Sequence, residues 1–200
     1  GCETRIVESR PNRSSVIGRL RGAGDGPTLL FNGHMDVQPP GNNWTRDPFG
    51  AAIEGTRLFG QGAMDMKAGL TAIILALEYL KRDGTKLRGD ILVTAVADEV
   101  SGGHLGTGFL VANGLIDADM AVVCEPTGDV VRVAHRGALW LEITVTGKSA
   151  HGGRPWLGVN ALSKAAKIIA GIENDLLPGL QTRTHPLLPA PTINIGRLTG

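Results

Sequence analysis

The chain has 200 residues, of which 42% are hydrophobic and 20% are charged, and its formal net charge is +1. This near-neutral, ordinary globular composition argues against nucleic acid or an anionic membrane as partners, and no apolar run reaches the ~18 residues of a membrane span. The two cysteines, Cys2 and Cys124, lack CxxC spacing, so we expect a reducing, cytoplasmic compartment rather than a disulfide scaffold.

Short apolar runs near the N-terminus predict strands. Residues 15–20 alternate in polarity, as a strand with one buried face does, and residues 28–32 form a continuous apolar run that is typical of a central strand. Residues 51–59 follow a loop rich in Pro, Gly and Asn and are expected to form an edge hairpin.

The clearest predicted helix follows Gly60-Gln61-Gly62. Asp65 lies at its expected N-terminus, where the helix dipole and free N–H groups favour a carboxylate. A capping role would account for Asp65, but the two glycines indicate a sharp bend that aims its side chain. The helix is expected to end at Asp83, with Gly84 as its C-terminal cap. Its apolar stripe consists of Leu70, Ile73, Ile74, Leu77 and Leu80.

Two more buried strands are expected at residues 91–97 and 118–124, with a short helix at residues 105–113 between them. Strands that alternate with helices predict an α/β fold in which helices flank a mainly parallel sheet. We expect this domain to cover residues 1–131.

The pattern changes near Val131. Residues 139–146 alternate like a strand of an antiparallel sheet, a helix is expected after Asn160, and residues 192–196 begin another alternating strand. These elements predict a small α+β domain at residues 132–200. It is expected to be incomplete, because so few elements cannot bury a sheet face.

Carboxylates and one histidine follow the predicted buried strands. His34 and Asp36 come after the first central strand, Glu99 after the second and Glu125 after the third, while Asp65 opens the helix. In a parallel sheet such positions meet at the carboxyl edge. One histidine with several carboxylates suits zinc, and a glutamate beside a metal is a common general base. For each residue alone, a structural role at a strand end is the alternative.

These residues stand in motifs that resemble one family of zinc metallopeptidases and deacylases, which includes acetylornithine deacetylase, succinyl-diaminopimelate desuccinylase, aminoacylase and glutamate carboxypeptidase. The resemblance covers nearly the whole chain, and its motifs are specific in combination and order. It implies a zinc-peptidase catalytic domain with a ferredoxin-like lid. The matching segments are Gly33-His34-Met35-Asp36, Gly60-Gln61-Gly62-Ala63-Met64-Asp65-Met66-Lys67, Ala97-Asp98-Glu99, Cys124-Glu125-Pro126-Thr127, and Ser149-Ala150-His151 followed by Gly158-Val159-Asn160-Ala161.

The resemblance also implies a role for each residue of the first domain. His34, Asp65 and Glu125 would bind metal, with Asp65 bridging two zinc ions and Asp36 orienting the His34 ring. Glu99 would be the general base that takes a proton from the attacking water and passes it to the leaving amine. The peptide bond after Asp65 is expected to be cis, as it is in the family.

In the lid, the resemblance implies that His151 stabilises the tetrahedral oxyanion. Asn160 and Arg154 would contact the substrate, although a helix-start asparagine and a solvated arginine account for them equally well. The implied cofactor is zinc, as one or two ions, with cobalt or manganese as substitutes. The implied partners are a small N-acyl amino acid or peptide substrate and a second copy of the full-length protein, joined through the lid in a homodimer.

One motif departs from the family's pattern. The family usually reads Asp-Glu-Glu, the first Glu being the base and the second a ligand to the other zinc, whereas this chain reads Asp98-Glu99-Val100. Without gaps, Glu99 is the base and one ligand is missing. If the frame shifts by one residue, Asp98 is the base and Glu99 the ligand. We favour the gapless frame because it keeps the strand register. The family's last ligand, a histidine after the lid, has no counterpart before residue 200, so we expect a fragment of a longer protein.

The sequence therefore predicts zinc-dependent hydrolysis of an amide bond in N-acyl amino acids or small peptides, by a chain that binds at most one zinc well. The alternative is a non-catalytic or fragmentary relative that binds a single zinc or a partner, and Val100 is the feature that favours it. A nucleotide-binding domain is a third reading, but Gly60-Gln61-Gly62 lacks the third glycine of the dinucleotide motif.

Overall fold

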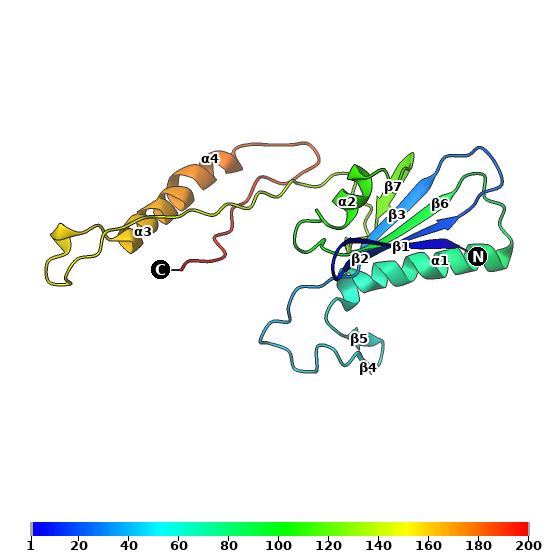
Figure 1. Ribbon diagram of the computed structural model, residues 1–200, viewed down its shortest axis with the longest axis horizontal. Helices are drawn as coiled ribbons and strands as arrows, with labels where there is room; N and C mark the ends of the chain where they lie inside the picture. The colour runs from blue at the N-terminus through cyan, green and yellow to red at the C-terminus, as the bar shows by residue number, and fades with distance from the viewer. Residues whose placement is uncertain (1, 200) are drawn as a thin grey trace. The chain divides into compact units, whose positions relative to one another are not determined.

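The computed structural model describes residues 2–199 and contains two compact units, Gly1–Val130 and Val131–Gly200. A five-stranded sheet with helices forms the first unit, and helices joined by long extended segments form the second (Figure 1).

The sheet of the first unit has the strand order β1-β2-β6-β3-β7. Its parallel part consists of β6 (Ile91–Val96), β3 (Leu29–His34) and β7 (Met120–Val123), which are the three apolar runs of the sequence. The other strands, β1 (Glu3–Arg10) and β2 (Arg13–Leu20), run antiparallel to their neighbours. The sheet is therefore mixed rather than mainly parallel. The two-residue turn between β1 and β2 can join only antiparallel strands.

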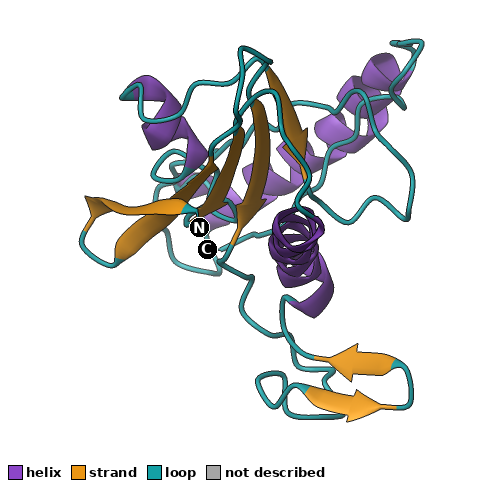
Figure 2. Ribbon diagram, turned by 90° about the vertical axis from the view of Figure 1, so that its right-hand side faces the viewer, coloured by secondary structure: helices purple, strands orange, loops and turns teal. Residues whose placement is uncertain are grey.

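Two helices cover opposite faces of this sheet. Leu70 of α1 (Gly69–Asp83) packs against Gly33, whereas Leu110 of α2 (Thr107–Ala112) shares a buried cluster with Leu30. Positions 30 and 33 point to opposite sides of β3, because side chains alternate along a strand. Figure 2 shows helices on both sides of the strands. The buried cluster on the α2 side consists of Val7, Ile17, Leu30, Leu92, Val96 and Leu110.

The helix α1 forms where the sequence predicted it. Its buried face carries Ile73, while Ile74 is 61% exposed and does not belong to that face. The helix ends at Gly84, whose φ of 72° is the left-handed conformation expected of a glycine C-cap. The start differs from the expectation. Asp65 does not lie at the helix N-terminus but in the kinked turn before it, η1 (Ala63–Ala68), where Asp65 and Met66 have non-helical backbone angles.

The expected hairpin is present as β4 (Ala52–Glu54) and β5 (Arg57–Phe59), but it forms a sheet of its own. Arg46 pairs with Glu54, and its guanidinium lies 4.3 Å from the centre of the Phe59 ring. These contacts between the hairpin and the preceding loop stabilise the hairpin, which within residues 2–199 does not pair with any strand of the five-stranded sheet.

In the second unit, α3 (Ala161–Gly171) follows Asn160 as predicted, and η3 (Ile172–Leu176) and α4 (Leu177–Gln181) continue it. A short 3-10 helix, η2 (Pro155–Leu157), precedes them. The strands expected at residues 139–146 and 192–196 are absent from the described part of this unit, where one isolated bridge joins Lys148 and Val159. An alternating segment becomes a strand only when a neighbour satisfies its N–H and C=O groups.

Among the described residues, no helix has both the length and the apolar character needed to cross a membrane.

An ion-pair network fixes the start of β6. The Asp90 carboxylate accepts hydrogen bonds from the N–H of Gly22 at 2.9 Å, from Arg19 at 2.8 Å and from Arg21 at 3.2 Å. The Gly22 N–H and the two guanidinium groups lower the pKa of Asp90 below its usual value of 3.8. These contacts therefore stabilise the fold above the unfolded-state pKa and are lost as the pH falls through the folded-state pKa.

We predict that Asp90→Asn lowers the free energy of unfolding most above about pH 5, with the deficit shrinking toward about pH 2 as wild-type Asp90 becomes protonated. Urea denaturation across this pH range checks the prediction. Asp25→Asn is the matched control, since Asp25 makes only an exposed ion pair with Arg88 at 3.6 Å. A deficit for Asp90→Asn that stays constant with pH would contradict the prediction.

Candidate metal centre

Three neighbouring strands bring the candidate residues to one edge of the sheet. His34 ends β3 and pairs with Val96, and the Met35 N–H donates to the Val96 carbonyl at 2.8 Å. On the other side of β3, the Cys124 N–H donates to the Asn32 carbonyl at 3.0 Å. The segments that carry Glu99 and Glu125 therefore leave the sheet beside His34, as expected for the carboxyl edge of parallel strands.

Two glycines allow the backbone segments around the site to approach closely. A Cβ atom at Gly33 would lie 2.7 Å from Cε of Met66, and one at Gly69 would lie 2.3 Å from the Cys124 carbonyl oxygen. The first contact packs β3 against the turn that holds Asp65. The second packs the start of α1 against the residue before Glu125. The Gly69 contact is with backbone and cannot tolerate a side chain, whereas a side chain at Gly33 would force the Met66 and Leu70 side chains to move.

The tautomer of His34 follows from its contacts. The side chain is 2% exposed, and Nδ1 lies 2.8 Å from the main-chain carbonyl oxygen of Asp36. Since a carbonyl oxygen can only accept, Nδ1 carries the proton and donates to it. Nε2 faces Oδ1 of Asp65 at 3.0 Å, so without a metal the hydrogen bond there needs a proton on Nε2. A metal ion that replaces this proton meets the Nε2 lone pair of a neutral ring with Nδ1 protonated, which is the arrangement of a metal-binding histidine.

Nε2 of His34 faces a cluster of carboxylates. It lies 3.0 Å from Oδ1 of Asp65, 3.6 Å from Oε1 of Glu125 and 3.6 Å from Oε2 of Glu99. One ligand atom from each of His34, Asp65 and Glu125 lies within 4.8 Å of the other two. Ligands at about 2.1 Å from a tetrahedral ion would be about 3.4 Å apart. One imidazole nitrogen and two carboxylates at this spacing fit a zinc-type cation.

The electrostatics of the cluster favour a cation. Burial lowers the pKa of His34, but the hydrogen bond to the Asp36 carbonyl, the hydrogen bond to Asp65 and the charges of Glu125 and Glu99 outweigh it and raise the pKa overall. The pKa of Glu125 is also raised, mainly by burial. The charges of Asp65 and Glu99 raise it further, and the charge of His34 opposes this by lowering it. Three carboxylates crowded around one imidazole repel each other, and a divalent ion among them would relieve that repulsion.

The turn after β6 distinguishes Glu99 from Asp98. The Glu99 carboxylate is 51% exposed and lies at the cluster, whereas Oδ2 of Asp98 accepts a hydrogen bond from the Leu105 N–H at 2.9 Å. Asp98 also has a left-handed φ of 69°. Its carboxylate is therefore engaged within its own loop, and Glu99 is the acid presented to the centre.

The structure also shows features that the sequence did not indicate. The Asp36 carboxylate accepts hydrogen bonds from the N–H groups of Glu99 and Val100, at 3.2 and 3.1 Å. Gly69 is the second such feature, and no local pattern in the sequence marks its close approach to Cys124.

The expected cis peptide bond is present between Asp65 and Met66.

The remaining candidate residues belong to the second unit. Nδ1 of His151 accepts a hydrogen bond from the Gly153 N–H at 3.1 Å, so Nε2 carries the proton of the neutral ring. The Asn160 side chain caps α3 by accepting from the Ser163 N–H at 2.9 Å, which is the helix-start role considered for it. The Arg154 side chain is exposed, and the main-chain N–H of Arg154 donates to the main-chain carbonyl of His151 at 2.7 Å.

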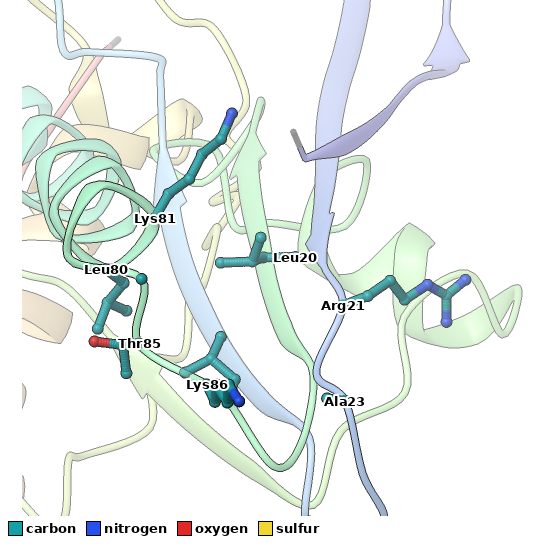
Figure 3. Close-up of a pocket in the computed structure, with 9 residues that line it drawn as sticks. Leu20, Arg21, Ala23, Leu80, Lys81, Thr85 and Lys86 are labelled. Carbon is teal, nitrogen blue, oxygen red and sulfur yellow. The ribbon is translucent and has the colours of Figure 1, made fainter.

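The hollow in Figure 3 lies elsewhere in the first unit. It has a volume of about 290 Å³ and is lined by the end of β2 and the C-terminal end of α1, including Leu20, Arg21 and Lys81. Leu20 pairs with Ile91, the first residue of β6. This hollow is therefore at the opposite end of the sheet strands from His34, which pairs with Val96 at the other end of β6. It is shallow and does not contribute to the candidate metal centre.

Comparisons with known sequences identify one family. The sequence model of peptidase family M20/M25/M40 matches residues 30–184 of this chain. A probable succinyl-diaminopimelate desuccinylase of Staphylococcus aureus is 34% identical over 164 residues, which cover 80% of this chain and 40% of the relative. The succinyl-diaminopimelate desuccinylase of Gluconobacter oxydans is 37% identical over 147 residues, covering 69% and 38%. The chain thus spans about 40% of the length of these relatives.

Solved structures agree in fold. A tripeptidase from Staphylococcus aureus superposes with a TM-score of 0.57 at 23% identity, covering 85% of this chain and 46% of that one. An M20 family metallo-carboxypeptidase from Sulfolobus solfataricus gives a TM-score of 0.50 at 26% identity, covering 60% and 28%. The mixed sheet with its helices is thus shared with metallopeptidase structures.

Proposed function

This chain belongs to peptidase family M20/M25/M40, and on that premise we propose that it forms the metal-binding part of a zinc-dependent hydrolase. The proposed reaction is cleavage of an amide bond in an N-acyl amino acid or a small peptide. The two desuccinylase relatives support an acyl amino acid substrate. The tripeptidase, similar at 23% identity, supports the fold alone.

The single observation that carries the proposal is the group formed by His34, Asp65 and Glu125, with Glu99 beside it. An imidazole nitrogen with a free lone pair and two carboxylates are typical zinc ligands, and cobalt or manganese can substitute at such sites. Asp65 is 63% exposed, so the centre is open to solvent and to a substrate.

Glu99 is the proposed general base. Bound by the three ligands, zinc would supply a Lewis acid that polarises the scissile carbonyl. The exposed Glu99 carboxylate takes a proton from the attacking water and delivers it to the leaving amine. The engagement of Asp98 with Leu105 supports this frame over the one in which Asp98 is the base.

We propose one tightly bound zinc per chain. Within residues 2–199, the group of His34, Asp65 and Glu125 is the set with metal-ligand geometry. Val100 occupies the position of the second acid that the resemblance implies for another zinc, and an alkyl side chain cannot bind a metal ion.

For the rest of the chain, we assign residues 1–131 to the catalytic domain and residues 132–200 to the lid through which full-length protomers dimerise. The division between Val130 and Val131 supports this assignment. The protonated Nε2 inferred for His151 is the kind of donor that an oxyanion requires, which supports its proposed role. Substrate contacts by Asn160 and Arg154 and a cytoplasmic location stay predictions.

An assay of amine release tests the function, using the protein as its gene encodes it. The substrates are N-succinyl-diaminopimelate, N-acetylornithine and a panel of dipeptides, each with added zinc and with a chelator. We expect turnover of at least one substrate, its loss on chelation and its recovery on adding zinc. Zinc-loaded protein that turns over none of these substrates, or turnover that a chelator leaves unchanged, would refute the proposal.

A further inference from the structure

The side chain of Asp36 contacts the loop of the proposed base more closely than it contacts the His34 ring. Oδ1 accepts from the N–H of Glu99 at 3.2 Å, and Oδ2 accepts from the N–H of Val100 at 3.1 Å. The shortest carboxylate contact with the ring, from Oδ1 to Nδ1 of His34, is 3.5 Å. The ring is held instead by the main-chain carbonyl of Asp36, at 2.8 Å.

The two functions of Asp36 are therefore separable. A substitution of its side chain leaves the main-chain carbonyl that fixes the tautomer and orientation of His34. It removes the acceptor for two successive N–H groups in the turn after β6. Hydrogen bonds from N–H groups to a carboxylate are charge-assisted and stronger than those to a neutral acceptor.

The start of this turn is held by hydrogen bonds to Asp98. The Gly103 N–H donates to the main-chain carbonyl of Asp98 at 2.7 Å, and the Leu105 N–H donates to its side chain at 2.9 Å. The Asp36 carboxylate holds the next two residues, which carry the base. Asp36 thus links the end of β3, with its metal ligand, to the backbone of Glu99.

We propose that Asp36 is a positioning residue whose carboxylate clamps the N–H groups of Glu99 and Val100 and thereby sets the position of the base relative to the metal ligands. The inference rests on the proposed function, because it assumes that Glu99 acts as the base. Positional errors of about 1 Å in a catalytic group can reduce a rate about 100-fold.

Asp36→Asn tests the clamp with little change in side-chain volume. Its amide can accept one of the two hydrogen bonds, but its NH₂ group then faces the other N–H. We expect kcat to fall about 10- to 100-fold, with KM and metal content unchanged. Amide hydrogen exchange at Glu99 and Val100 should accelerate, which is a readout that does not depend on turnover.

Asp47→Asn is the matched control, because Oδ1 of Asp47 accepts from the Phe49 N–H at 2.9 Å in another loop. It should leave kcat and the exchange of Glu99 and Val100 unchanged. Asp36→Ala is the second variant, and circular dichroism with thermal unfolding confirms that each variant is folded before comparison.

Two outcomes would overturn the clamp. Unchanged exchange at both amides in folded Asp36→Asn and Asp36→Ala would show that the carboxylate does not hold the turn. The second is a loss of metal affinity without faster amide exchange. A loss of about 10- to 100-fold is typical when a residue that hydrogen-bonds to a metal ligand is removed, and it would show that Asp36 acts on His34. If wild-type protein turns over no substrate, the proposed function fails, whereas the exchange measurement still decides the clamp.

Discussion

Replacing Glu99 with Gln should reduce hydrolysis by about 10²- to 10⁴-fold, the usual contribution of a general base, while the protein keeps its metal. Glutamine has nearly the same shape but cannot take up the proton of the attacking water. The Glu99 carboxylate lies 3.6 Å from Nε2 of His34 and is not one of the three grouped ligands, so its neutralisation should leave metal binding intact.

The measurement pairs kcat/KM with metal content by mass spectrometry on the same preparation. Glu78→Gln, at an exposed position of α1, is the control and should behave as wild type. Retained turnover by folded Glu99→Gln would remove Glu99 from the role of base. Joint loss of turnover and metal would make Glu99 a ligand, as in the shifted frame with Asp98.

The second large effect is expected for His34→Ala. This change removes the imidazole lone pair and leaves two carboxylates as ligands. Loss of a residue that only hydrogen-bonds to a ligand lowers metal affinity about 10- to 100-fold, so the loss of a ligand itself should lower it further. Hydrolysis should fall with it. His185→Ala removes an exposed histidine of the second unit and should keep one metal per chain.

Isothermal titration with zinc, after removal of bound metal by a chelator, measures the affinities of wild type and of both histidine variants. Because His34 is 2% exposed, circular dichroism must first show that the variant is folded. Wild-type affinity in folded His34→Ala would exclude His34 as a ligand.

The sequence predicted the elements that carry the site, because their signals are local. The apolar runs before His34, Glu99 and Glu125 became β3, β6 and β7, and the carboxyl-edge rule for parallel strands brought their ends together. Gly84 ended α1 as a local C-cap signal predicts.

Features that depend on distant partners were not predictable. The direction of β1 and β2 depends on which strand each one pairs with. Residues 139–146 show a strand's alternation, yet Trp140 is 88% exposed and the segment has no strand partner among the described residues. The Asp36 carboxylate meets amides more than sixty positions away in the chain, at Glu99 and Val100. The spacing of a motif cannot show such a contact.

Anomalous diffraction at the zinc absorption edge, from crystals of the zinc-loaded protein, tests the proposed centre most directly. We predict one strong peak per chain, bonded to Nε2 of His34 and to carboxylate oxygens of Asp65 and Glu125 at about 2.0–2.2 Å. Zinc bound at full occupancy elsewhere, with no peak among these three side chains, would contradict the assignment of the metal centre and the function proposed from it.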